Sequence, residues 1–590
     1  MWNICILISI MFLLISILSV IYNVKKNDRK KVNNPITILA VGFFASAFVL
    51  FLPICSVQYK DYTGRLLLTI LASLHNCIRM FLVDIDFGVV TEAGSEMTSG
   101  VRNAYVILGA IVITVSPLLT VGVFLSFFKN AMSYQRYILH YRSDVYVFSE
   151  INEKTLALAE SIRETDKKCL LVFTDVFESE EERSYELRER ANLLNALCFK
   201  KDIIKIKFQF HSEKSQMYFM LMGEDENENV EQALTLINNY KQFSKARIYL
   251  LAKTEEAELI LKATDQGKIQ MVRRFKEAES LIFRILYDTG NKIFEHTRLR
   301  DGKKLISAII VGMGEYGMEM AKAMPWFCQM PEYCFEMHIV DRDEKTQSKL
   351  EMMCPDLLSS KYNGVAIEGE PNYKITVHSG IDVNTIEFKK LLEKIENPTY
   401  VFVALGNDGQ NIKTSIDVRS FYADHVFEPR IQAILFKGAE KERLYEVKCN
   451  QRATTKPYQI EFVGDLKTTY SKESVLYSEV EKKALKRHWD WGATMNEFWT
   501  YDYSYRSSIA SVIHHKMKIL CKIPYAEVEP EKRPNQEREA LRKLEHCRWS
   551  AYVRSEGYTF GKTRNDLAKK HPCLVPYDEL SPVEKAKDDV

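Results

Sequence analysis

The chain opens with long apolar stretches and continues as a body in which apolar runs alternate with charged helical segments. Residues 3–22 are almost uninterrupted apolar sequence, about the twenty residues that a membrane-spanning helix needs. A second such run extends from about Ile36 to Val57, and a third from about Ala104 to Phe128. No positive segment precedes the first run and no small-residue cleavage site follows it, so we expect an anchor rather than a cleaved signal peptide. The pattern predicts a membrane module over residues 1–130.

The run from Leu66 to Val83 is ambiguous because it is apolar at first but contains His75 and Arg79. Five Lys or Arg residues follow the first span, and Lys129, Arg136 and Arg142 follow the third. The positive-inside rule places both groups in the cytoplasm, so an even number of crossings separates them. We therefore expect three spans, a re-entrant or surface helix at 66–83 facing outwards, and a cytoplasmic C-terminal body. Four spans that break the charge rule are the alternative.

The order of the second span, the half-buried helix and the third span resembles the pore layout of potassium-channel-like proteins. The filter sequence TVGYG is absent from the chain. Asp84, Asp86 and Glu92 would then stand near the outer mouth. If they line a pore they favour cations; the alternative is a solvated loop.

The body begins with alternating strand and helix patterns, typical of a parallel α/β sheet. Strands are expected at residues 144–148, 169–175, 203–210 and 247–252 within a first unit spanning 141–300. Its first turn, Phe148 to Asn152, has no glycine, although a backbone that approaches a pyrophosphate needs one. We expect a structural or assembly domain without a bound dinucleotide.

A second α/β unit, 303–465, contains the turn GMGEYG between a buried-type strand and a helix. Gly312, Gly314 and Gly317 suit a tight turn, close phosphate approach and helix–strand packing, and Asp341 at the end of the next strand can hold a ribose hydroxyl. The expected cofactor is NAD or another adenine nucleotide; the alternative is a retained fold with an empty site. Further strands are expected at 373–380, 399–408, 431–436 and 458–464. His338, inside a strand, is expected to be a satisfied core residue.

Residues 404–418 (ALGNDGQNIKTSIDV) resemble the fourth-strand turn of TrkA-N domains, the regulators of potassium conductance (RCK). The resemblance covers about 141–465 and implies two Rossmann-like, RCK-type domains. It also implies that Asn407 and Asn411 line the nucleotide cleft. Two such units behind a membrane module are similar to the layout of RCK-gated channels and of Castor/Pollux-type channels.

The C-terminal part is expected to hold a linker helix at 466–505 and a small, mainly helical module at 506–590. Residues 541–589 resemble the RyR domain, the repeat of ryanodine receptors and of various bacterial proteins. The features shared with it include His546 and Trp549 on a helix, and Leu574-Val575-Pro576-Tyr577. A ligand can be stacked or paired by an aromatic and basic set: Trp549, Tyr558, Arg564, His571 and Tyr577. The alternative is that the aromatic residues are core and that Arg564 pairs with Asp566.

Composition and the absence of certain motifs argue against several classes of function. Lys and Arg total 80 against 78 acidic residues, so the net charge of +2 argues against a nucleic-acid partner. Twelve cysteines without metal-finger spacing indicate reduced thiols. The chain has no GxSxG, HExxH or Walker A motif, and we expect no enzyme.

The leading hypothesis is a multi-pass cell-membrane homo-oligomer, a ligand-gated ion channel or membrane-permeabilising effector that senses a nucleotide-like ligand. The RyR-type resemblance further implies a place in antiviral defence. The alternatives are a membrane-anchored NAD-dependent enzyme and a non-conducting scaffold.

Overall fold

The chain forms two compact units, Met1–Leu139 and His140–Val590. The computed structural model describes all residues except 1, 27–34, 83, 86, 94–96, 140–142, 175–181, 209–214, 241–244, 255–259, 261–271, 359–360, 363–364, 367–372, 424, 426, 438–458, 477, 493–497, 500 and 590.

The first unit is helical, with a central helix against which three others pack. Its helices are α1 (Trp2–Lys26), α2 (Pro35–Gln58), α3 (Arg65–Phe81), α4 (Gly88–Ala93) and α5 (Ser99–Leu139). Helix α2 contacts α1, α3 and α5, and the Tyr105 hydroxyl of α5 donates a 2.5 Å hydrogen bond to the Leu50 carbonyl of α2. Within the described residues, three helical stretches are long and apolar enough to span a membrane: Trp2–Ile21, Ile38–Gln58 and Ser99–Val121.

Helix α3 occupies the ambiguous run and is not among those three stretches. Its buried positions include Thr69, Ser73 and Cys77, whereas the leucines Leu66 and Leu67 are 76% and 63% exposed. A helix in water buries its leucines. The reversed pattern of α3 therefore suits surroundings as apolar as a lipid tail, and the sequence was right to expect a helix here.

The body begins with a six-stranded parallel sheet in the order β3-β2-β1-β4-β5-β6. Its strands are β1 (Val145–Phe148), β2 (Leu170–Phe173), β3 (Leu197–Cys198), β4 (Met217–Leu221), β5 (Ala246–Leu251) and β6 (Val272–Phe275). Helices α6 (Glu153–Thr165), α7 (Glu182–Leu193), α8 (Glu226–Tyr240), α10 (Glu277–Thr289) and α11 (Asn291–Glu295) accompany them.

One expected strand is wrong. Residues 203–208 form no strand; Ile203–Lys205 is a short 3-10 turn, and residues 209–210 lie outside the described part of the chain. The Asp202 carboxylate caps the turn by accepting a 3.1 Å hydrogen bond from the Ile204 N–H. A local side-chain cap thus prevails over an alternating pattern that suits a strand equally well.

The second sheet repeats the strand order of the first, as β12-β9-β8-β13-β14-β15, with β7 antiparallel to β8 at one end. Its strands are β7 (Arg298–Arg300), β8 (Lys303–Val311), β9 (Tyr333–Asp341), β12 (Tyr373–Ser379), β13 (Tyr400–Val403), β14 (Arg430–Ile434) and β15 (Ile460–Val463); β10 (Lys361–Tyr362) and β11 (Val365–Ala366) form a separate pair.

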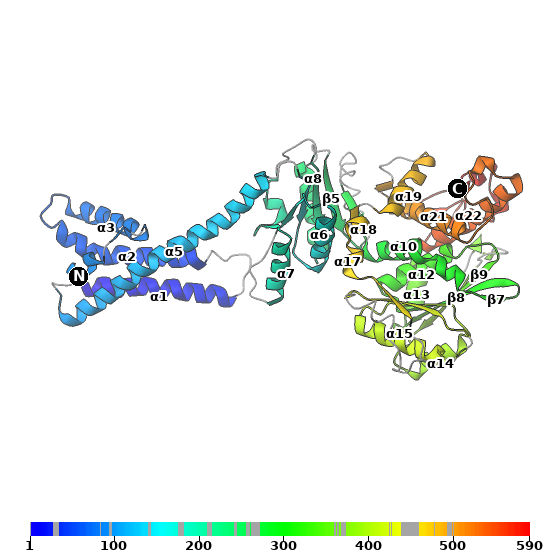
Figure 1. Ribbon diagram of the computed structural model, residues 1–590, viewed down its shortest axis with the longest axis horizontal. Helices are drawn as coiled ribbons and strands as arrows, with labels where there is room; N and C mark the ends of the chain where they lie inside the picture. The colour runs from blue at the N-terminus through cyan, green and yellow to red at the C-terminus, as the bar shows by residue number, and fades with distance from the viewer. Residues whose placement is uncertain are drawn as a thin grey trace. The chain divides into compact units, whose positions relative to one another are not determined.

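Both faces of the second sheet are covered (Figure 1). The helices that follow its strands are α12 (Glu315–Phe327), α13 (Thr346–Met353), α14 (Ile386–Lys394) and α15 (Asp408–Tyr422). Ile306, Ala308 and Ile310 of β8 face α10 and α12, while Ile309 and Val311 face α14 and α15. This alternation explains why β8 is a continuous apolar run.

The C-terminal part is helical and shares the core of the second sheet. Its elements are α17 (Leu466–Thr469), α18 (Lys472–Leu476), α19 (Glu479–Asp490), α21 (Asp502–Leu520), α22 (Asn535–Ser555), the strand pair β16 (Thr559–Phe560) and β17 (Lys570–His571), and α23 (Pro582–Ala586). The single linker helix expected at 466–505 is wrong, because short helices replace it. Asp465 caps α17 through the Thr468 N–H, and the Ser471 hydroxyl accepts the Ser474 N–H in α18. The Ser581 hydroxyl caps the final helix, α23, by accepting the Glu584 N–H.

Candidate functional site

The glycine turn joins β8 to α12 and has the backbone that the spacing predicts. Gly312 has φ +92°, and a Cβ there would lie 2.4 Å from the Ala404 carbonyl oxygen. A Cβ on Gly317 would lie 1.8 Å from the Gly312 oxygen. A Cβ on Gly314 would meet nothing within 4 Å among the described residues. The first and third glycines are therefore needed for packing, while the second leaves open space beside the start of α12.

Asp341 ends β9 beside this turn. Its carboxylate accepts the Met313 N–H at 2.6 Å and the Asp343 N–H at 2.8 Å. A carboxylate has about four lone-pair positions, so two remain for a ligand hydroxyl. Glu315, which brings an unfavourable charge for an anion into the turn, lies 2.9 Å from the Lys253 ammonium that follows β5. The first α/β unit thus neutralises the one acidic side chain of the turn.

The opposite wall follows β13, the strand next to β8. The Asn407 side chain caps α15 by accepting the Gln410 N–H at 3.1 Å. Asn411 is fully buried; its oxygen accepts the Leu405 N–H at 2.7 Å and its nitrogen donates to the Ile434 carbonyl at 2.9 Å. Both candidate asparagines lie at the expected edge of the sheet, but the amide of Asn411 is occupied in holding the ends of β13 and β14 together.

The first sheet carries the same polar arrangement around Asn229. The Asn229 oxygen accepts the Gly223 N–H at 2.9 Å, and its nitrogen donates to the Leu251 carbonyl at 3.3 Å. An acidic residue stands three positions before Asn229 and before Asn411. Glu226 accepts the Thr254 N–H, which follows β5, and Asp408 accepts the Phe436 N–H, which follows β14. Strand order and side-chain contacts agree, so the two sheets are structural repeats.

The equivalent turn of the first sheet is filled. Glu150 accepts the Glu224 N–H at 3.1 Å, and burial raises the pKa of its carboxyl. Asn152 caps α6 by accepting the Thr155 N–H at 2.9 Å. An anion at this helix terminus would meet one carboxylate and find a capping N–H already used.

The aromatic and basic residues predicted in the C-terminal module lie together. Ring centroids are 4.8 Å apart for Trp549 and His571, 6.5 Å for Tyr558 and His571, and 5.8 Å for His546 and Tyr577. His571 is 8% exposed, and burial lowers its pKa to about 4, so its ring is neutral at pH 7.

Arg564 stands at the rim of this cluster. It pairs with Asp566 at 2.9 Å and lies 5.6 Å from the centroid of the Tyr503 ring. Tyr558 and Tyr577 are 6% and 5% exposed. Most of the aromatic surface is therefore packed within the module, and Arg564 is the member of the set with the most exposed side chain.

A buried ion cluster connects the glycine turn to the C-terminal module. Arg506 of α21 lies 2.7 Å from Glu319 of α12, 3.2 Å from Glu279 of α10 and 3.3 Å from Glu556 after α22. Lys322 of α12, which is partly exposed, lies 3.7 Å from Glu556. Sequence reasoning missed this cluster, since its members come from three separate helices and from the residue that follows a fourth.

A second buried cluster lies between α21 and α22. Glu545 lies 2.7 Å from Arg548, 3.7 Å from Lys518 and 3.9 Å from His514. The Glu545 pKa is lowered to about 2, because the favourable effect of its neighbours, Arg548 and Lys518 first, exceeds the cost of burial. Burial lowers the Lys518 pKa to about 8 and those of His514 and His515 to about 3.

The remaining residues singled out in the sequence are the acidic residues near the proposed pore mouth and His338. Asp84 is exposed and pairs with Arg79 at 3.0 Å, and Glu92 is an exposed residue of α4. Asp86 lies outside the described residues. His338 is half-buried; a ring nitrogen lies 3.1 Å from one of His378, and burial lowers its pKa to about 4. No group of three or more His, Cys, Asp or Glu that could hold a metal occurs in the described part of the chain.

Comparison with known proteins supports the C-terminal resemblance. Residues 522–589 match the family model described as RyR domain. No curated protein matches the chain significantly. The chain therefore combines apolar helices able to span a membrane, two parallel α/β sheets and an RyR domain.

Proposed function

We propose that this protein is a ligand-gated ion channel of the cell membrane whose cytoplasmic body binds an adenine nucleotide at the Gly312–Gly317 turn. The observation that carries the proposal is the place of this turn. It follows β8, which lies beside β13 where the strand order of the second sheet reverses. Dinucleotides bind in this crevice in Rossmann folds, whose strand order is the same. RCK-type identity of both units is part of the proposal.

The chemistry of binding comes from backbone groups. The start of α12 offers N–H donors and a positive helix end to phosphate, and the open side of Gly314 admits it. Asp341 would hold a ribose hydroxyl, Asn407 would stand on the opposite wall, and Asn411 would fix that wall. The Glu150-filled turn of the first sheet would stay without nucleotide.

The signal would travel through α12. The carboxylate of Glu319, one turn into this helix, is fixed by Arg506, which also holds the end of α22 in the RyR domain. A shift of α12 would move both ends of this cluster. A ligand gates only if it binds one arrangement more tightly than the other. Trp549, His571 and Arg564 would sense the same ligand or a second nucleotide-like one.

The membrane unit would form the pore by homo-oligomerisation, with α3 as an outward-facing re-entrant helix and Asp84, Asp86 and Glu92 near its mouth. Membrane attachment together with nucleotide sensing fits a membrane-permeabilising effector in antiviral defence.

The test is ion flux from liposomes containing the full-length protein, with NAD, ATP and ADP-ribose added in turn. We expect one nucleotide to trigger flux in the wild type and in Gly314→Ala, but not in Gly314→Asp, whose carboxylate repels phosphate. Nucleotide binding without ion flux would contradict the channel function and favour a non-conducting scaffold or a membrane-anchored enzyme. Absence of nucleotide binding would remove the proposed site.

A further inference from the structure

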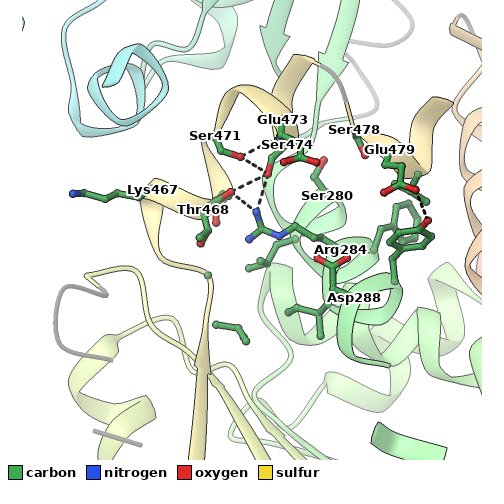
Figure 2. Close-up of a pocket in the computed structure, with 18 of the residues that line it drawn as sticks. Ser280, Arg284, Asp288, Lys467, Thr468, Ser471, Glu473, Ser474, Ser478 and Glu479 are labelled. Atoms are coloured by element: carbon green, nitrogen blue, oxygen red, sulfur yellow. Dashed lines mark hydrogen bonds between the residues drawn. The ribbon is translucent and has the colours of Figure 1, made fainter. Parts of the chain in front are cut away.

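A groove of about 760 Å³ lies away from the glycine turn, between α6, α10, β15 and the segment of α17 to α19 (Figure 2). Its apolar wall includes Leu281, Ile285 and Val463, and hydroxyl groups enter it from Ser280 and Ser478. Volumes of this size are typical of small-molecule sites.

Arg284 of α10 is the fixed cation of the groove. Its Nη1 donates to the Thr468 carbonyl and, at 2.8 Å, to the Ser474 hydroxyl. Among the described residues, no carboxylate lies within 4.0 Å of its guanidinium, and Nε and Nη2 make no hydrogen bond. Burial lowers the pKa of the Arg284 guanidinium. Arginine side chains are not deprotonated in proteins, so the group is a cation. Only Nη1 of the guanidinium forms hydrogen bonds with the protein. The Nε–Nη2 edge is available and has the geometry to donate two hydrogen bonds to an oxyanion.

The carboxylates of the groove divide into two kinds. Glu160, Glu461 and Glu479 are paired with Arg190, Arg430 and Lys483 at 2.6–2.8 Å. Glu481 lies 3.9 Å from Arg273. Glu164 of α6, Asp288, one turn along α10 from Arg284, and Glu473 of α18 form no ion pair within the described residues. Of these three, Asp288 and Glu473 act on the charge of Arg284. An available guanidinium edge beside these two carboxylates is complementary to a ligand with both signs of charge.

We propose that this groove binds a small zwitterion of the α-amino-acid class. The ligand carboxylate would bind the Nε–Nη2 edge of Arg284, its ammonium group would bind Asp288 or Glu473, and its side chain would pack on Leu281 and Val463. An inorganic phosphate fits less well, because the two carboxylates repel a dianion and leave their own charge uncompensated. Because the ligand would join α10 to α17 and α18, it would stabilise the segment that leaves the second sheet. This site is independent of the nucleotide function.

The experiment is calorimetric titration of the detergent-solubilised full-length protein with each of the twenty amino acids and with inorganic phosphate. We expect one amino acid to bind, and its decarboxylated amine and its N-acetyl derivative each to bind at least about tenfold more weakly. Arg284→Met should weaken binding by a similar factor. Lys467→Met removes a cation from the same segment whose ammonium group points away from Arg284, and should leave affinity unchanged (Figure 2).

Ser478→Trp, which fills the groove and leaves the contacts of Arg284 intact, separates loss of binding from loss of folding. It should abolish binding while circular dichroism stays unchanged. The proposal is overturned if no amino acid binds at 10 mM (roughly −3 kcal/mol). It is equally overturned if phosphate binds as tightly as the amino acid, or if Arg284→Met and Ser478→Trp bind the amino acid like wild type.

Discussion

The guanidinium of Arg506 lies 2.7 Å from the carboxylate of Glu319, although 187 residues separate them in the chain. This contact joins the helix of the glycine turn to α21, the helix that precedes the residues matched to the RyR domain. Since Glu279 and Glu556 also lie within 3.3 Å of Arg506, one side chain holds three carboxylates from three elements.

Arg506→Met should destabilise the body by about 3–5 kcal/mol, because removal of one partner leaves buried charges uncompensated. Differential scanning calorimetry in detergent is the measurement. Lys532→Ala is the control, since it breaks an exposed Lys532–Glu529 pair. Equal melting temperatures for the two variants would contradict a structural role of the cluster.

Gly317→Ala should lower the melting temperature of the body much more than Gly314→Ala does. The new Cβ of the first variant meets a backbone oxygen at 1.8 Å, while that of the second meets nothing within 4 Å. Overpacking of this kind costs about 1–3 kcal/mol or more. Gly314→Asp places a capping residue at the start of α12, so it should be as stable as wild type while losing nucleotide affinity.

Asn411→Ala should cost at least about 2 kcal/mol, because it leaves the Leu405 N–H and the Ile434 carbonyl without their partner. Asn229→Ala should cost a similar amount in the first sheet. Hydrogen exchange at the ends of β13 and β14 should rise in the first variant alone. Global unfolding caused by either substitution would contradict a local role.

Acid should destabilise the C-terminal module through His515. Its folded pKa of about 3 lies below the unfolded value of about 6.5, so the unfolded chain binds the extra proton between these pH values. The contribution of His515 to the free energy of unfolding is fully present above pH 6.5. It falls by up to about 1.4 kcal/mol per pH unit as the pH decreases towards 3. The neighbouring charges are Lys518, Arg487, Arg533 and Glu545. The melting temperature of His515→Gln should fall less steeply between pH 6.5 and 4.5; parallel curves would contradict this.

Cysteine labelling tests the topology of α3. In a cysteine-free background, Asp61→Cys before α3 and Asp84→Cys after it should both react with an impermeant maleimide added outside the cell. Protection of position 84 alone would mean that α3 crosses the membrane.

The features predictable from sequence are those written in consecutive residues. The run Leu305–Val311, the glycine triplet and the three long apolar runs each carry a local pattern that predicted the observed element. The cluster around Arg506 carries none, because its partners come from α10, α12 and the end of α22. Three strands of the first sheet were not predicted: Leu197–Cys198, Met217–Leu221 and Val272–Phe275. The first has two residues, too few to show a period, and the other two have only five and four.

The filled turn of the first sheet has a consequence for stoichiometry. Ser149 directly follows β1 and Asn152 caps α6, at the places that Gly312 and Gly314 hold in the second sheet, and Glu150 fills the turn between them. Under the proposed function, the tandem repeat would offer one glycine-turn crevice for a nucleotide where duplication would have supplied two. In a homo-oligomer the number of nucleotides bound at glycine turns at saturation would therefore equal the number of subunits. The steepness of any cooperative response would then be limited by how many chains assemble, rather than by how many sheets each chain contains.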